Sequence, residues 1–150
     1  MGQYWKAVNL DKREYLDPHK MDSGAKLWEQ LAAPSVGQAL VILCAAQREA
    51  RGAGDLDMDI NWHGPEREFP QHDACGGPMP SDYPAIAMRT IGRWAGNRVA
   101  FVGDYAQDSD LPGSPYATSK IYECTDNGDW TDVSDDVLAV IAHELSPVNA

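Results

Sequence analysis

Residues 3–16, QYWKAVNLDKREYL, contain two short β-type runs on either side of a polar turn, and this stretch decides the fold class. Gln3–Asn9 and Glu14–Leu16 predict two strands, with Asp11-Lys12 as the turn between them. Pro18 then disfavours a helical conformation at Asp17, so the second strand ends there. The chain therefore opens with an N-terminal β-hairpin.

Three segments beyond this hairpin carry helical patterns. Ser23 can cap a short helix over Ala25–Ala32, and Pro34 separates it from a second, more apolar helix over Val36–Ala50. A terminal helix begins at Ser134, with acids in its first turn. We expect the buried stripes of the first and last helices to be formed by Leu27, Trp28 and Leu31, and by Val137, Leu138, Ile141 and Leu145.

The middle of the chain combines a long irregular stretch with further β-type runs. Residues 52–84 are rich in Gly, Pro, Asp and His and predict a long irregular loop. Gly96-Asn97 predicts the turn of a central hairpin between Thr90–Trp94 and Arg98–Gly103, and Ser119–Cys124 predicts one further strand. Strands and helices do not alternate as βαβ units. This order predicts a single α+β domain over 1–150, with an antiparallel sheet packed by about three helices.

The charge is strongly asymmetric along the chain. The formal net charge is −11, but residues 1–51 have a net charge of +1, whereas residues 52–150 have −12. From Asp104 onward there are ten acids and a single Lys. Such a surface repels nucleic acid and attracts a basic protein. It predicts no direct contact with nucleic acid.

Other composition features point to a cytoplasmic protein. No segment approaches the roughly 18 apolar residues of a membrane span, and the first 15 residues lack the apolar core of a secretory signal. The three cysteines, Cys44, Cys75 and Cys124, are odd in number and widely spaced, which fits a reducing compartment. Cys44 lies in an apolar run and is expected in the core.

A catalytic interpretation centres on the end of the N-terminal hairpin. His19 could act as a general base held by Asp17, because the ordinary pKa of imidazole lies near neutrality. Asp104 and Tyr105 follow the predicted central hairpin and could join them. The alternative is a histidine that hydrogen-bonds to hold the hairpin in place. No serine-hydrolase elbow, phosphate-binding loop, dinucleotide fingerprint or zincin motif is present.

Metal ligands occur in the predicted loop without a recognised spacing. His63, His72 and Cys75 are residue types that suit zinc, but they match no closed structural pattern and need a fourth ligand, such as Asp73 or His19. Asp55, Asp57, Asp59 and Glu66 imitate part of a calcium-binding loop, yet Ile60 stands where glycine is required. The sequence therefore favours no metal and predicts no cofactor.

Three stretches resemble a family of small uncharacterised bacterial and bacteriophage proteins. They are residues 1–21, MGQYWKAVNLDKREYLDPHKM, residues 91–99, IGRWAGNRV, and residues 102–106, VGDYA. The resemblance covers roughly the first 30 residues, the central hairpin and the terminal strand–helix pair, and excludes residues 52–84. It implies a single-domain protein of phage or mobile-element type and transfers no catalytic residue.

The leading hypothesis from sequence is a non-enzymatic binding protein with a basic protein partner. One concrete version is a phage-type acidic inhibitor that mimics nucleic-acid charge. The acids expected to form one outward-facing field, together with an exposed Trp130, are Asp104, Asp108, Asp110, Asp126, Asp129, Asp132, Asp135 and Asp136. Two alternatives remain open: the small enzyme or metal-dependent hydrolase around His19, and a housekeeping module that binds its partner through Tyr4 and Trp5 of the N-terminal hairpin.

Overall fold

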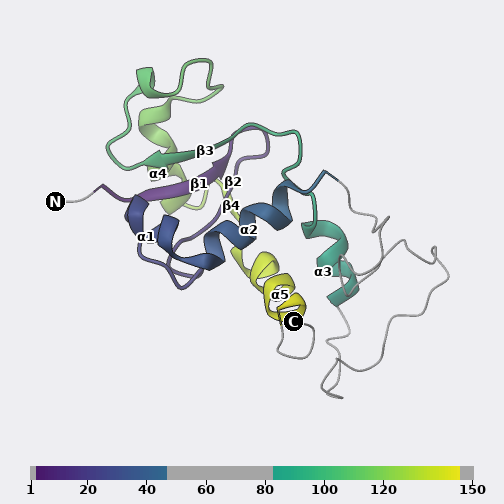
Figure 1. Cartoon of the computed structure of the whole chain (residues 1–150). Helices are drawn as coiled ribbons and strands as arrows, with labels where there is room; N and C mark the ends of the chain where they lie inside the picture. Colours follow the sequence, from purple (N-terminus) through teal and green to yellow (C-terminus); the bar gives the residue numbers. More distant parts are fainter. Residues whose placement is uncertain (1–2, 47–82, 146–150) are drawn as a thin grey trace.

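A computed structural model describes residues 3–46 and 83–145, which form a sheet with helices on both faces (Figure 1). The elements in chain order are β1 (Trp5–Asn9), β2 (Glu14–Tyr15), α1 (Leu27–Ala32), α2 (Pro34–Cys44), α3 (Tyr83–Thr90), β3 (Val99–Gly103), the 3-10 turn η1 (Asp108–Asp110), α4 (Thr118–Asp126), β4 (Thr131–Asp132) and α5 (Ser134–Glu144). The predicted α+β class is confirmed.

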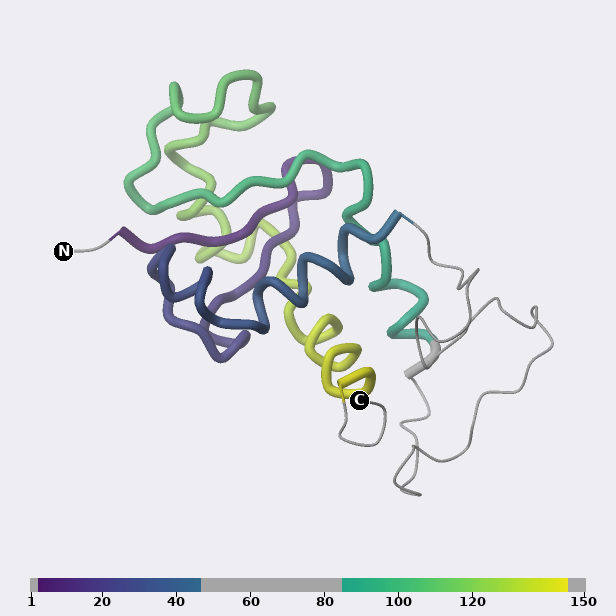
Figure 2. Tube along the Cα trace, in the orientation of Figure 1, coloured from purple at the N-terminus to yellow at the C-terminus, as the bar shows by residue number. Residues whose placement is uncertain are grey.

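The four strands lie in the order β3-β1-β2-β4, so β1 and β3, far apart in the sequence, lie side by side (Figure 2). Strand β1 is antiparallel to both of its neighbours, with Val8 opposite Tyr15 on β2 and Ala7 opposite Phe101 on β3. The short β4 runs parallel to β2. The sheet is therefore mixed, because the chain enters β4 from the same end of the sheet as β2.

The predicted N-terminal hairpin is confirmed, and its turn is held by a side chain. The Asn9 Oδ1 atom accepts hydrogen bonds from the backbone N–H groups of Asp11 and Lys12, each at 2.9 Å. Arg13 adopts a positive φ of 56° to return the chain into β2. The short asparagine side chain thus replaces the glycine that a tight two-residue turn normally needs.

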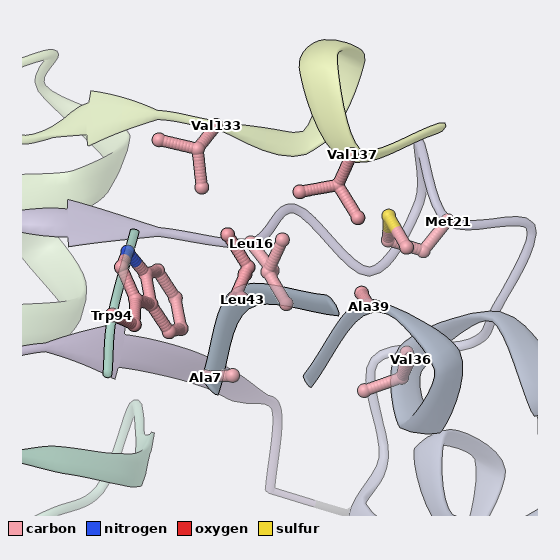
Figure 3. Close-up of a cluster of buried hydrophobic side chains, with 9 residues drawn as sticks. All are labelled: Ala7, Leu16, Met21, Val36, Ala39, Leu43, Trp94, Val133 and Val137. Atoms are coloured by element: carbon pink, nitrogen blue, oxygen red, sulfur yellow. The ribbon is translucent and has the colours of Figure 1, made fainter. Parts of the chain in front are cut away.

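Alternation along β1 divides the core between the two faces of the sheet. Ala7 faces helices α2 and α5, and the cluster on this side contains Leu16, Met21, Leu43, Trp94 and Val137 among others (Figure 3). Val8 faces the opposite side, where helix α4 packs through Ile121 beside Trp130. Successive strand residues point to opposite faces, so one strand contributes to both clusters.

The predicted central hairpin is wrong. The Gly96-Asn97 turn exists, with Gly96 at a φ of 78°, and Val99–Gly103 is a strand, but residues 90–94 are the end of α3 and a following turn. Strand β3 pairs with β1 instead of with them. Trp94 is buried at 1% exposure in the core, and this long-range packing outweighs the local hairpin preference.

The strand predicted over Ser119–Cys124 is also wrong, because these residues belong to helix α4. Thr118, Ile121 and Thr125 are its buried residues, a spacing of three and four that matches one face of a helix. The Asp108 carboxylate accepts hydrogen bonds from the Ser119 N–H at 2.9 Å and the Ser119 hydroxyl at 2.8 Å, which supports the start of the helix.

Two helical predictions hold in position but not in burial. The first helix is present as α1, yet its apolar residues are largely exposed, with Trp28 at 77% and Leu31 at 73%, while Gln30 is buried. Gln30 donates to the carbonyls of Trp5 and Ala25, so its amide ties the helix to the sheet. Cys44, expected in the core, is exposed at the end of α2. The predicted extension of this helix to Ala50 and most of the 52–84 loop lie outside the described residues.

The terminal helix is confirmed as α5, but its first turn is supported by a different acid. Ser134 is the first helical residue, and its N–H donates to the Asp132 Oδ1 atom at 2.9 Å. The Ser134 hydroxyl oxygen instead accepts the Asp17 N–H at 2.7 Å. Val137 is buried, Leu138 and Ile141 pack partly against the same cluster, and Leu145 is 54% exposed.

Candidate functional site

The acids of the C-terminal half fall into two groups according to their partners. The first group lies on β4 and α5 and pairs with cations from other elements. The Lys20 ammonium lies 2.9 Å from Asp132 and 3.4 Å from Asp135, and Arg89 holds Asp136 through two hydrogen bonds of 2.8 Å. These three carboxylates are locally compensated.

The ion pairs also affect the protonation of the acids. The hydrogen bond from Arg89 lowers the pKa of Asp136 against a smaller opposing effect of burial. Burial acts to raise the pKa of Asp132, but hydrogen bonds from Ser134 and Lys20 outweigh it and lower that pKa. Both carboxylates are therefore held in the charged form that the pairing requires.

The second group lies in residues 104–130, which we call the acidic lobe and which contain six acids and one lysine. The lobe comprises η1, α4 and their connections, and it projects from the upper left of the view in Figure 1. Among the described residues, no Lys or Arg forms an ion pair with Asp104, Asp108, Asp110 or Asp129. The last three are exposed and Asp104 is half-buried.

Neutral hydrogen-bond donors hold three of these unpaired acids. Asp110 accepts from the Gln107 N–H at 2.8 Å, and Asp108 accepts from Ser119 as described above. The backbone and hydroxyl hydrogen bonds from Ser119 lower the pKa of Asp108. Asp104 and Tyr4 exchange two bonds, from the Tyr4 N–H to Asp104 Oδ1 at 3.0 Å and from the Asp104 N–H to the Tyr4 carbonyl at 2.9 Å. These contacts orient the carboxylates without cancelling their charge.

A buried lysine lies where the acidic lobe meets the sheet. The Lys6 side chain is 8% exposed, and its ammonium donates to the Thr125 hydroxyl at 2.8 Å and to Asp126. The ammonium also lies 4.3 Å from the ring centroid of Tyr122 and 5.2 Å from that of Tyr15. The lysine thus compensates Asp126 and anchors the end of α4 to β1.

Acids from separate chain segments surround these tyrosines. Burial, followed by the negative charges of Asp126, Asp104 and Asp17, raises the pKa of Tyr122 to about 12. Burial also raises the pKa of Tyr15, with further contributions from Asp132 and Asp17. The fold therefore brings together carboxylates that are more than 80 residues apart in the sequence.

The residues of the catalytic hypothesis do not form a hydrogen-bonded group in the structure. His19 is exposed, and the Asp17 Oδ1 atom accepts the backbone N–H of His19 at 3.0 Å, which is a local turn contact. Within residues 3–46 and 83–145, no hydrogen bond or ion pair joins the side chain of His19 to Asp104 or Tyr105. Tyr105 is 62% exposed.

The expectation that Trp130 is exposed is wrong. It is 5% exposed, and its ring meets that of Tyr116 edge to face, with centroids 5.3 Å apart. Trp130 supports the lobe from beneath, between α4 and the sheet. The large aromatic side chains that remain exposed beside the acids are Tyr4 at 50% and Tyr105.

The described residues contain no group of three or more His, Cys, Asp or Glu side chains arranged to hold a metal ion. The sequence candidates His63, His72 and Cys75, together with the Asp55–Asp59 acids, lie outside the described part of the chain. Every helix in the described ranges is too short or too polar to cross a lipid bilayer.

Comparisons with known proteins add no relative. No family model matches the chain, and searches of curated proteins and of solved structures found no match. The functional argument therefore depends on the geometry of the acidic lobe.

Sequence reasoning identified the acids but missed Lys6 and Tyr122 as their neighbours. A signal for Lys6 was present, since a charged residue in the middle of the predicted first strand requires either an exposed face or a buried partner. Tyr122 was placed in a predicted strand, so its position on the helix facing Lys6 could not be inferred.

Proposed function

We propose that this protein is a non-enzymatic binding protein whose acidic lobe engages a basic protein partner. The observation that carries this proposal is the contrast between the two groups of acids. Asp132, Asp135 and Asp136 are compensated by cations, whereas Asp104, Asp108, Asp110 and Asp129 have no cationic partner in the described residues. Uncompensated charge attracts a partner of opposite sign and accelerates association.

The exposed aromatic rings support the same surface. Tyr105 follows Asp104 directly, and the Tyr4 backbone is bonded to Asp104, so both exposed rings flank one unpaired acid. Tyrosine is enriched at the energetic centres of interfaces because it combines a large apolar area with a polar tip. The lobe therefore combines charge for steering with rings for contact.

In its concrete form, the proposal is that the lobe mimics the charge of nucleic acid and occupies the nucleic-acid-binding surface of its partner. This form implies a cytoplasmic interaction with a basic nucleic-acid-binding protein and no direct contact with nucleic acid. It agrees with the resemblance of the chain to phage-type proteins.

The test compares two charge-neutralised variants of the full chain. The lobe variant carries Asp104→Asn, Asp108→Asn, Asp110→Asn and Asp129→Asn, because asparagine retains an oxygen acceptor for the contacts of the lobe. The matched control carries Asp11→Asn, Asp132→Asn, Asp135→Asn and Asp136→Asn, which removes the same total charge from acids that already have cationic partners. Circular dichroism confirms that each variant is folded.

Each immobilised protein is used to capture partners from the native cell at low and moderate salt, with identification by mass spectrometry. We expect the wild type and the control to retain a basic nucleic-acid-binding protein that the lobe variant loses. Binding of the purified partner should weaken steeply with salt and compete with duplex DNA. Equal retention by the lobe variant, or salt-insensitive binding, would rule out the proposal.

A further inference from the structure

Strand β3 forms one edge of the sheet, with β1 on its inner side (Figure 1). The ladder between them shows which backbone groups face outward. The Leu10 N–H donates to the Arg98 carbonyl at one end, and the Asp104 N–H donates to the Tyr4 carbonyl at the other. Because antiparallel pairs alternate, the even-numbered residues of β3 bond to β1, and Val99, Phe101 and Gly103 direct their N–H and C=O groups away from it.

These outward groups are almost entirely unpaired in the described chain. The Gly103 carbonyl accepts the Ala106 N–H at 3.2 Å, and no other hydrogen bond within residues 3–46 and 83–145 reaches the outward groups. Val99 and Phe101 are half-buried, so this edge is not enclosed. An unpaired strand edge is a template for an added strand, and many proteins protect such an edge with proline, a bulge or an inward-pointing charge.

We propose that two copies of this protein associate through their β3 strands, paired antiparallel about a two-fold axis at Phe101. In this register Val99 lies opposite Gly103 of the second copy, and Phe101 lies opposite its own counterpart. Each of these pairs exchanges backbone hydrogen bonds between groups that are otherwise directed outward. The two sheets then join into one continuous sheet.

The charges at the two ends of β3 select a second copy as the occupant. Arg98 and Asp104 lie three residues on either side of Phe101, so the proposed register places Arg98 of each copy opposite Asp104 of the other. These two positions form non-hydrogen-bonded pairs, in which facing side chains approach most closely. The Arg98 side chain is 55% exposed, and Asp104 has no cationic partner in the described residues. The strand is thus complementary in charge to itself.

The first test removes one outward donor. Val99→Pro deletes an outward N–H at the first residue of β3, where proline is tolerated, and leaves the ladder to β1 intact. Val99→Ala is the matched control, because it loses the same packing but keeps the N–H. In sedimentation equilibrium at about 0.15 M salt, we expect wild type and Val99→Ala to dimerise and Val99→Pro to be monomeric. A monomeric wild type at high micromolar concentration, or a Val99→Pro dimer as tight as that of Val99→Ala, would overturn the proposal.

The second test exchanges the paired charges. Arg98→Glu and Asp104→Lys each place like charges opposite one another twice in a dimer, so each variant alone should dimerise about tenfold more weakly or worse. An equimolar mixture of the two variants restores both opposite-charge pairs. It should form a heterodimer, detected by native mass spectrometry, and a mixture that stays monomeric contradicts the register. The readout is self-association of purified protein, so its outcome is separate from that of partner capture by the acidic lobe.

Discussion

The carboxylate of Glu14 on β2 receives the guanidinium of Arg93, 79 residues further along the chain, through Nε at 2.9 Å and a second contact from Nη2. Glu14 is only 4% exposed, and it also accepts the indole N–H of the buried Trp94 at 3.0 Å. The hydrogen bond from Glu14 raises the pKa of Arg93 above its ordinary value. This pair connects the N-terminal hairpin to the turn that precedes β3.

We predict that Glu14→Ala lowers the free energy of unfolding by about 3 kcal/mol, because it leaves a buried indole N–H and a partly buried guanidinium without an acceptor. Glu14→Gln should cost less, since its amide oxygen still accepts from Trp94. The measurement is equilibrium urea unfolding. As a control, Glu123→Gln removes an exposed i,i+3 pair with Lys120 and should change stability by less than about 0.5 kcal/mol. Equal costs for Glu14→Ala and Glu123→Gln would contradict this role.

The pair between Asp136 and Arg89 predicts a dependence of stability on acid pH. The pKa of Asp136 is lowered in the folded state, so its contribution is present above the unfolded value of about 3.9 and is lost as the pH falls through the folded value. Asp136→Asn should therefore cost about 0.5 kcal/mol near neutrality and progressively less in acid. Urea unfolding at a series of pH values measures this difference, and a cost that stays constant down to about pH 3 would argue against the linkage.

Tyr122 predicts the opposite behaviour at alkaline pH. Its pKa is raised to about 12 in the folded state, so the stabilisation that it contributes is complete below the unfolded value of about 10 and is lost as the pH rises towards 12. Tyr122→Phe cannot ionise, and its stability should fall less than that of the wild type over this range. Thermal unfolding followed by circular dichroism measures both proteins, and ultraviolet titration should show loss of a tyrosine that ionises near pH 12. Parallel pH profiles for the two proteins would disprove the assignment.

Two glycines in open surroundings should respond to alanine with opposite signs. Gly128 has a φ of 80° after helix α4, and Gly37 lies within helix α2, and an added Cβ meets nothing within 4 Å at either position. Gly128→Ala should destabilise the protein by about 1 kcal/mol through backbone strain alone. Gly37→Ala should stabilise it by roughly 0.5–1 kcal/mol through helix propensity and reduced entropy of the unfolded chain. Urea unfolding of both variants checks the signs, and a stabilising Gly128→Ala would exclude strain at that turn.

The sequence carried enough local information for the elements whose stability is mainly local. The N-terminal hairpin and α5 were predictable from strand-forming residues around a polar turn and from an apolar stripe behind acids at a helix start. The same patterns failed where packing at long range decided the conformation. Residues 119–124 have β-type side chains, but they are helical because Ile121 and Thr125 pack against the sheet on one face.

The amount of negative charge and its concentration after Asp104 follow from the sequence alone, because net charge is a sum that does not depend on conformation. Which of those acids remain without a cation was decided by the tertiary structure, since Lys6, Lys20 and Arg89 come from three distant elements. The placement of β3 at an open edge was likewise a tertiary outcome. Ion pairing and strand order depend on distances between segments far apart in the chain, and local patterns contain no information about those distances.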